Sequence, residues 1–243
     1  MIRRTVLAAG LAAAALATTS LAAFAQEAIR IGLILPMTGP FASTGKQIAA
    51  AVDLYVKSQS ASVAGRRIEV IVKDDGGVAD ASKRLAQELI VNDKVTAIAG
   101  FGLTPLALAA APLATQAQTP MVVMSAATSI ITERSPYIVR TSQVVPQIAA
   151  PFGAWARKQG MKRVVTVVTD YAPGHDVEKW FADAFKAAGG EVESLRVPLQ
   201  NPDFSPFLQR VAEMKPDALL VFVPSGVGAQ FMKQFVERGL DKS

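Results

Sequence analysis

The sequence has 243 residues, with 25 basic and 20 acidic residues, a single histidine and no cysteine. One histidine without cysteine excludes the usual zinc sites and thiol catalysis, so we expect no metal and no cofactor. The formal net charge of +5 is not gathered into a basic stripe of the kind that nucleic-acid binding requires, so we expect no nucleic-acid partner.

The first 25 residues have the pattern of a secretory signal peptide. Arg3 and Arg4 precede an apolar run over 5–17, and Ala23 and Ala25 provide the small-x-small pattern of a cleavage site. The alternative is a membrane anchor, but the run is short for a bilayer core of about 30 Å. We therefore expect export of the chain and removal of residues 1–25.

From Ile29 onward, short β-branched runs alternate with helical segments, which is typical of βαβ units and parallel sheets. Strands are expected over Ile29–Leu35, Arg67–Lys73, Val95–Gly100, Pro120–Met124, Arg163–Thr169, Glu191–Pro198 and Ala218–Val223. Helices are expected over Ser43–Gln59, Asp80–Asn92, Thr104–Gln116, Pro146–Gln159, Asp176–Ala188, Asp203–Met214 and Gly226–Arg238. The predicted fold class is α/β.

A weak internal repeat indicates two similar halves. Segments 65–100 and 189–223 each contain a glycine, a strand, a loop, an Asp-x-Ser helix start and a closing strand. Asp80 and Asp203 are predicted N-caps, and Pro206 fits the first turn of its helix. We expect a first lobe over 26–143 and a second over 144–243, with ligand bound between them beyond the carboxyl ends of the strands.

The stretch LPMTGPFASTGKQ resembles a phosphate-binding loop, but its spacing is wrong. Five residues separate Gly39 from Gly45 instead of four, and Gln47 follows Lys46 where a metal-binding hydroxyl is needed. A phosphate-loop enzyme that transfers phosphoryl groups is therefore kept only as an alternative, and we expect the protein not to be an enzyme.

Other catalytic arrangements are equally unsupported. A Ser-His-Asp triad would have to use His175, yet no G-x-S-x-G elbow is present, and the nearest serine-glycine pair contains Ser225. Asp74 and Asp75 could be paired carboxylates, but in the sequence KDDGG they are better explained as turn-capping residues. No G-x-G-x-x-G sequence follows a predicted strand, so a dinucleotide cofactor is unsupported.

Three segments of the first half end strands and begin helices or loops, namely MTGPFASTGK, GFGLTPLA and SAATSIITE. Helix N-termini provide unpaired N–H donors and a partial positive charge, so these segments could hold a small carboxylate without a cation. Thr104 and Thr128 could add hydroxyl groups. The alternative is that these hydroxyls only cap their own helices.

These segments, with VIVKDDGG, YIVRTSQ and PDFSPFL, resemble the branched-chain amino acid (Leu/Ile/Val) binding protein family in order and spacing. Members of that family are periplasmic substrate-binding proteins of ABC transporters with the type I periplasmic binding protein fold. The resemblance implies two Rossmann-like lobes that close on one small ligand, a periplasmic location, a monomer, and a membrane permease as partner. A ligand sensor of the same fold, acting on a signalling partner, is the alternative.

The resemblance also implies a set of ligand-binding residues. The family holds the ligand carboxylate and ammonium at the positions of Thr104, Ala126, Ala127 and Thr128, while Ser43 and Thr44 match the side-chain end of the pocket. Tyr171, Pro173 and Ser225 are the candidates from the second lobe. Amino acid binders often have an aromatic residue where this chain has Pro173, which leaves open whether the ligand is an amino acid or a related small carboxylate or amide.

Full-length members of the family continue beyond the point at which this sequence ends, in ERGLDKS. The resemblance therefore implies a C-terminally truncated chain, in which the second lobe and the return of the chain to the first lobe are incomplete.

Overall fold

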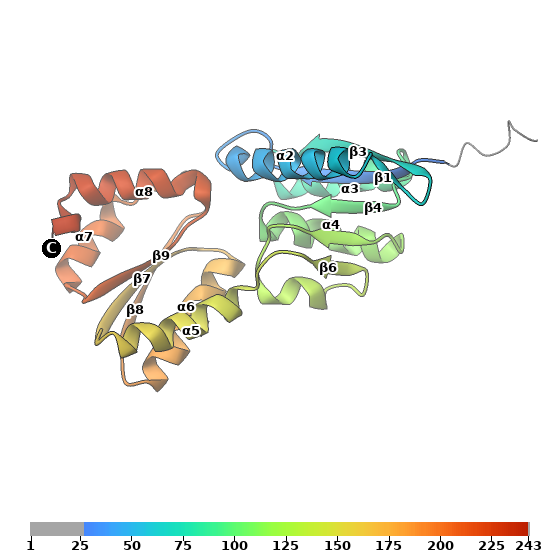
Figure 1. Ribbon diagram of the computed structural model, residues 1–243. Helices are drawn as coiled ribbons and strands as arrows, with labels where there is room; N and C mark the ends of the chain where they lie inside the picture. Colours follow the sequence, from blue (N-terminus) through green and yellow to red (C-terminus); the bar gives the residue numbers. More distant parts are fainter. Residues whose placement is uncertain (1–26, 243) are drawn as a thin grey trace, which may run out of the picture.

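The computed structural model describes residues 27–242, which form two α/β lobes (Figure 1). The predicted signal peptide over 1–25 lies outside the described residues. Among the described residues, no helix combines the length and the hydropathy that crossing a membrane requires.

The first lobe contains a six-stranded sheet in the order β2-β3-β1-β4-β5-β6, which is parallel except for the β2–β3 pair. Its strands are β1 (Ile29–Leu35), β2 (Ser62–Val63), β3 (Arg66–Asp74), β4 (Ala97–Gly100), β5 (Met121–Val123) and β6 (Ile138–Arg140). Its helices are α2 (Ala42–Ser58), α3 (Ala79–Val91), α4 (Thr104–Gln116) and the short 3-10 helix η1 (Ser129–Glu133).

Opposite faces of this sheet bury different helices. Leu89 of α3 and Leu106 of α4 belong to one buried cluster, and both side chains are fully enclosed. Leu33 and Leu35 of β1 point to the other face, where Ile48 of α2 packs against them. The apolar residues of β1 thus face helices on both sides, as expected of a central strand in a parallel sheet.

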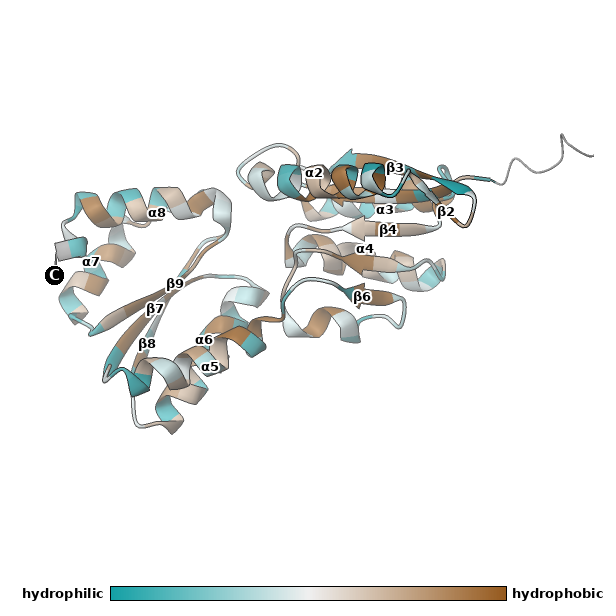
Figure 2. Ribbon diagram, viewed as in Figure 1, coloured by the Kyte–Doolittle hydropathy of each residue, from teal (hydrophilic) through white to brown (hydrophobic). Residues whose placement is uncertain are grey.

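The second lobe contains a parallel three-stranded sheet in the order β8-β7-β9. Its strands are β7 (Arg163–Thr169), β8 (Glu191–Val197) and β9 (Ala218–Phe222). Its helices are α5 (Val145–Lys158), α6 (Ala172–Ala187), α7 (Ser205–Met214), α8 (Ser225–Glu237) and the 3-10 helix η2 (Leu240–Lys242). Strands β7 and β9 are brown in Figure 2, in agreement with a sheet covered by α5 and α6 on one face and by α7 and α8 on the other.

Every predicted strand and helix has a counterpart in the structure, and two strand predictions, Ile29–Leu35 and Arg163–Thr169, have the observed bounds. The short strands β2 and β6 were not predicted. Helix α6 begins at Ala172, earlier than the predicted Asp176, because Pro173 is accommodated in the first turn, where its missing N–H group costs no hydrogen bond.

The predicted N-caps differ in outcome. Asp80 was wrongly predicted as an N-cap, since it lies inside α3 and the capping position is Val78. Asp203 lies one residue before the N-cap of α7, yet its carboxylate accepts a hydrogen bond of 3.0 Å from the Ser205 N–H group. Pro206 occupies the first turn of α7, as predicted.

Candidate ligand-binding site

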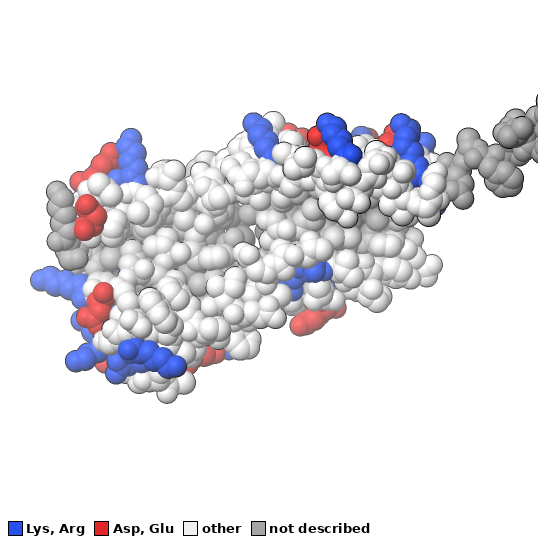
Figure 3. All heavy atoms as spheres, in the orientation of Figure 1, with Lys and Arg blue, Asp and Glu red and all other residues white. Residues whose placement is uncertain are grey.

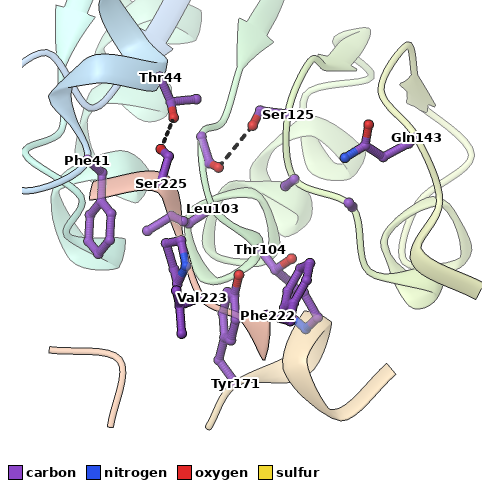
Figure 4. A pocket seen from close by; sticks show the side chains of 15 residues that line it. Phe41, Thr44, Leu103, Thr104, Ser125, Gln143, Tyr171, Phe222, Val223 and Ser225 are labelled. Carbon is purple, nitrogen blue, oxygen red and sulfur yellow. Dashed lines mark hydrogen bonds between the residues drawn. The ribbon is translucent and has the colours of Figure 1, made fainter. Parts of the chain in front are cut away.

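A cavity of about 220 Å³ lies between the two lobes, at the carboxyl ends of strands from both sheets. Figure 4 shows Thr104 and Ser125 on its first-lobe side and Tyr171 and Phe222 on its second-lobe side. Its lining consists of Phe41, Thr44, Gly102, Leu103, Thr104, Ser125, Ala126, Ala127, Gln143, Tyr171, Pro173, Phe222, Val223, Pro224 and Ser225.

The N-terminus of α4 lines the first-lobe wall of the cavity. The chain turns sharply after β4, because Gly100 has a φ of +112° and a side chain there would meet the Ile34 carbonyl oxygen at 2.2 Å. Thr104 begins α4, only 1% of its surface is exposed, and its hydroxyl has no hydrogen-bond partner in the structure. A buried hydroxyl without a partner at the start of a helix is suited to bind an anionic ligand.

The loop after β5 is tied to the loop after β4. Ser125 donates a hydrogen bond of 3.2 Å to the Gly102 carbonyl, and the Ala126 N–H group donates one of 3.1 Å to the Phe101 carbonyl. These bonds hold the Ser125–Ala126 segment beside the start of α4. The two loops of the first-lobe wall are therefore held together by hydrogen bonds within the lobe.

The second-lobe wall is largely aromatic and apolar. Tyr171 follows β7, and burial raises the pKa of its phenol, so the hydroxyl remains protonated at neutral pH and can donate a hydrogen bond. Phe222 ends β9, and Val223 and Pro224 follow it along the wall. The side chains of this wall offer flat contact area and one phenolic hydroxyl.

Thr44 of α2 and Ser225 of α8 meet at the edge of the cavity, where their hydroxyl oxygens are 3.0 Å apart (Figure 4). Two glycines flank Thr44, Gly39 in the turn before α2 and Gly45 inside the helix, where it packs against the backbone of Pro36. Gly39 has a φ of +73°, and a side chain at Gly45 would meet the Pro36 carbonyl oxygen at 2.2 Å. Lys46 lies on the first turns of α2, is exposed and is not among the residues that line the cavity.

None of the residues that line the cavity carries a charged side chain. In the face shown in Figure 3, charged side chains gather over α2 and at the far end of the second lobe. An anion in the cavity must therefore be held by backbone N–H groups, by hydroxyls and by the helix start. An ammonium group would find carbonyl oxygens and hydroxyls, but no carboxylate among the lining residues.

The structure brings seven of the nine predicted ligand-binding residues to this cavity. These are Thr44, Thr104, Ala126, Ala127, Tyr171, Pro173 and Ser225. Ser43 and Thr128 are not among the lining residues. The Ser43 hydroxyl accepts a hydrogen bond from Gln47, and the Thr128 hydroxyl donates one of 2.6 Å to Asp176.

Four further lining residues, Phe41, Gly102, Leu103 and Ser125, lie in the three segments proposed from the sequence but were not named individually. Gln143, Phe222, Val223 and Pro224 were not predicted. The last three lie at or just beyond the end of β9, so the rule that ligands bind beyond the carboxyl ends of strands could have found them. Gln143 is different, because it lies on the segment that connects the lobes and ends the YIVRTSQ motif, which carried the resemblance but gave this residue no role.

The paired carboxylates have the structural role that the sequence favoured. Asp74 accepts hydrogen bonds from the Met37 and Gly76 N–H groups, both at 2.8 Å, and Asp75 accepts one of 2.5 Å from the Ser82 hydroxyl. Within residues 27–242, no three histidine or acidic side chains are grouped closely enough to hold a metal ion.

Comparison with protein families gives a match to the periplasmic binding protein model over residues 28–243. A curated relative, the Leu/Ile/Val-binding protein homolog 6 of Brucella melitensis, is 44% identical over 238 residues, which are 96% of this chain and 61% of that protein. The chain thus spans about 61% of the length of this relative and of its counterpart in Brucella abortus.

Solved structures give a finer comparison. A solute-binding protein of an ABC transporter from Rhodopseudomonas palustris BisB5, in complex with 3,4-dihydroxy benzoic acid, is 62% identical, with a TM-score of 0.87 over 88% of this chain and 60% of that one. A second, from R. palustris, is in complex with benzoate and is 30% identical, with a TM-score of 0.83 over 88% of this chain and 60% of that one.

Proposed function

Because the chain belongs to the periplasmic binding protein family, we propose that it is a solute receptor that captures a small aromatic carboxylate, a benzoate with ring hydroxyl groups, and delivers it to the permease of an ABC transporter. It acts by binding, without chemical conversion of the solute, in the compartment outside the inner membrane.

The composition of the cavity lining carries the choice of ligand. The cavity has an aromatic second-lobe wall, an unpartnered buried hydroxyl on Thr104, and no charged side chain. A benzoate needs N–H and hydroxyl donors for its carboxylate and flat apolar contacts for its ring. A zwitterionic amino acid also needs a partner for its ammonium group, and an uncompensated buried charge is costly.

The arrangement supports one orientation of the ligand. The carboxylate lies at the start of α4, near Thr104 and the Ser125–Ala126 segment, where donors and the helix dipole favour negative charge. The ring then lies against Tyr171 and Phe222, and the protonated Tyr171 phenol is available to a ring hydroxyl. Contacts to both lobes stabilise the closed arrangement over an open one.

The names of the relatives point to two ligand classes. The structure with 62% identity holds a dihydroxybenzoate, whereas the curated relatives are named for leucine, isoleucine and valine. The latter names support a branched-chain amino acid receptor as the second candidate function. The cavity does not distinguish transport from a sensing role with the same ligand. The two roles differ in the partner protein, which is a membrane permease in transport and a signalling protein in sensing.

A ligand panel tests the proposal. We expect 3,4-dihydroxybenzoate and 4-hydroxybenzoate to raise the melting temperature and to give saturable heats in titration calorimetry, while leucine, isoleucine and valine do neither. A ligand at a hundred times its Kd adds about 2.7 kcal/mol to the free energy of unfolding. Binding of leucine with no response to either benzoate would replace the proposal by the amino acid receptor.

A further inference from the structure

The contact between the lobes at the edge of the cavity contains a glycine with no space for a side chain. Gly226 is the second residue of α8, and a Cβ atom placed on it would lie 1.6 Å from the Pro40 carbonyl oxygen and 2.5 Å from the Pro40 carbonyl carbon. Ordinary van der Waals contact of a Cβ begins at 3.4 Å, so a methyl group there is short of room by nearly 2 Å.

The first-lobe side of this contact is anchored in the core of its own lobe. Pro40 lies between Gly39, which holds a φ of +73°, and Phe41, whose ring is 98% buried in the core of the first lobe. The Ala42 N–H group donates a hydrogen bond of 3.2 Å to the Gly39 carbonyl, which closes the turn. The Pro40 carbonyl is thus held by the buried ring that follows it.

The second-lobe side is equally fixed. Val227 and Phe231 anchor α8 in the core of the second lobe, with 7% and 1% of their surfaces exposed. The Val227 and Gly228 N–H groups donate hydrogen bonds of 3.0 and 3.2 Å to the Pro224 carbonyl. A side chain at Gly226 can therefore be accommodated only if the two lobes separate.

We infer that Gly226 is a positioning residue that sets how closely the two lobes approach, and that any side chain at this position holds the cavity open. The neighbouring Thr44–Ser225 hydroxyl contact of 3.0 Å depends on the same approach, because Ser225 directly precedes the glycine. The effect on ligand affinity rests on the proposed function, whereas the effect on the distance between the lobes does not.

The chain offers a matched control on the same helix. A Cβ atom on Gly228 would come no closer than 3.9 Å to the Val223 side chain, which is an ordinary contact. Gly226→Ala and Gly228→Ala both add one methyl group near the start of α8 and both replace glycine by a better helix former. They differ in whether the methyl group meets the first lobe.

Disulfide trapping measures the approach of the lobes without ligand. The chain has no cysteine, so Thr44→Cys with Ser225→Cys gives one pair of thiols at the contact. We expect the pair to oxidise readily in the otherwise unchanged chain and in the Gly228→Ala background, and at least tenfold more slowly in the Gly226→Ala background. Equal rates in the two backgrounds, or no disulfide in any of them, would overturn the inference.

Ligand affinity gives a second, separate measurement. With 3,4-dihydroxybenzoate as the probe, we expect Gly226→Ala to raise the Kd at least tenfold and Gly228→Ala to leave it within about twofold. If no benzoate binds the unchanged chain, the proposed function fails while the trapping result still decides the inference. Loss of the folded circular dichroism spectrum in Gly226→Ala alone would assign the glycine to lobe stability and overturn the inference.

Discussion

Asp176 of α6 accepts a hydrogen bond of 2.6 Å from the Thr128 hydroxyl, which joins the second lobe to the loop that follows β5 of the first. The same carboxylate accepts a bond of 2.8 Å from the Ser129 N–H group. Arg140 donates to the Thr128 carbonyl, and burial lowers the pKa of its guanidinium, against the opposing effect of the Asp176 charge. Thr128 is therefore fixed at the junction of the lobes.

The coupling between Thr128 and Asp176 can be measured by a double-mutant cycle. We expect Thr128→Val to lower the free energy of unfolding by about 1–3 kcal/mol, because a hydrogen bond to a charged group is lost. In the Asp176→Ala background the same substitution should lower the free energy of unfolding by clearly less. The coupling energy measured by urea denaturation should be about 0.5–3 kcal/mol. Additive effects, together with a loss of ligand affinity from Thr128→Val, would return Thr128 to the ligand-binding set.

Thr104→Val removes the unpartnered hydroxyl at the start of α4. We expect ligand affinity in calorimetry with 3,4-dihydroxybenzoate to weaken by about 1–3 kcal/mol, because the carboxylate loses one donor in a buried site. Stability without ligand should not fall, since no hydrogen bond is broken. Thr119→Val, beyond the end of α4 and outside the cavity lining, is the control and should leave the Kd unchanged.

The substitution Lys46→Ala tests whether the loop at the start of α2 is a phosphate-binding loop. The lysine side chain is exposed on the first turns of α2 and does not line the cavity. We expect the Kd for the aromatic carboxylate to remain within a few-fold of the parent value. An ATP affinity that disappears with this lysine would contradict the description of the site.

Asp74 makes stability dependent on pH in a predictable direction. A hydrogen bond from the Thr38 hydroxyl, with those from the Gly76, Met37 and Thr38 N–H groups, lowers the pKa of this carboxyl below its usual value of 3.8. The depressed pKa means that the stabilisation is complete above pH 3.8 and is lost as the pH falls through the folded-state value.

Asp74→Asn should therefore destabilise the protein at neutral pH, by less than about 1 kcal/mol because the group is exposed. The difference in melting temperature between variant and parent should shrink as the pH is lowered below about 3.8. A difference that is constant from pH 7 to pH 3 would show that the carboxylate charge does not contribute.

The pattern of apolar residues determined much of the fold by itself. Alternating β-branched runs and amphipathic segments identify strands such as β1 and helices such as α3, because each must bury an apolar face against its neighbours. The carboxyl ends of the strands then indicate where a ligand binds, which is why Thr104 was predicted and lies at the cavity. Ala126 and Ser225, which also lie there, were predicted from the family resemblance.

Only the tertiary structure decided which side chains face the ligand. Thr104 and Thr128 have similar local sequence contexts, yet one hydroxyl is unpartnered at the cavity and the other is bonded to Asp176, 48 residues along the chain. The short edge strand β6 and Gln143 both lie in the YIVRTSQ motif, from which neither a strand nor a binding role was predicted. Such roles depend on how the two lobes meet, and contacts between distant residues are set by packing, which no short sequence window contains.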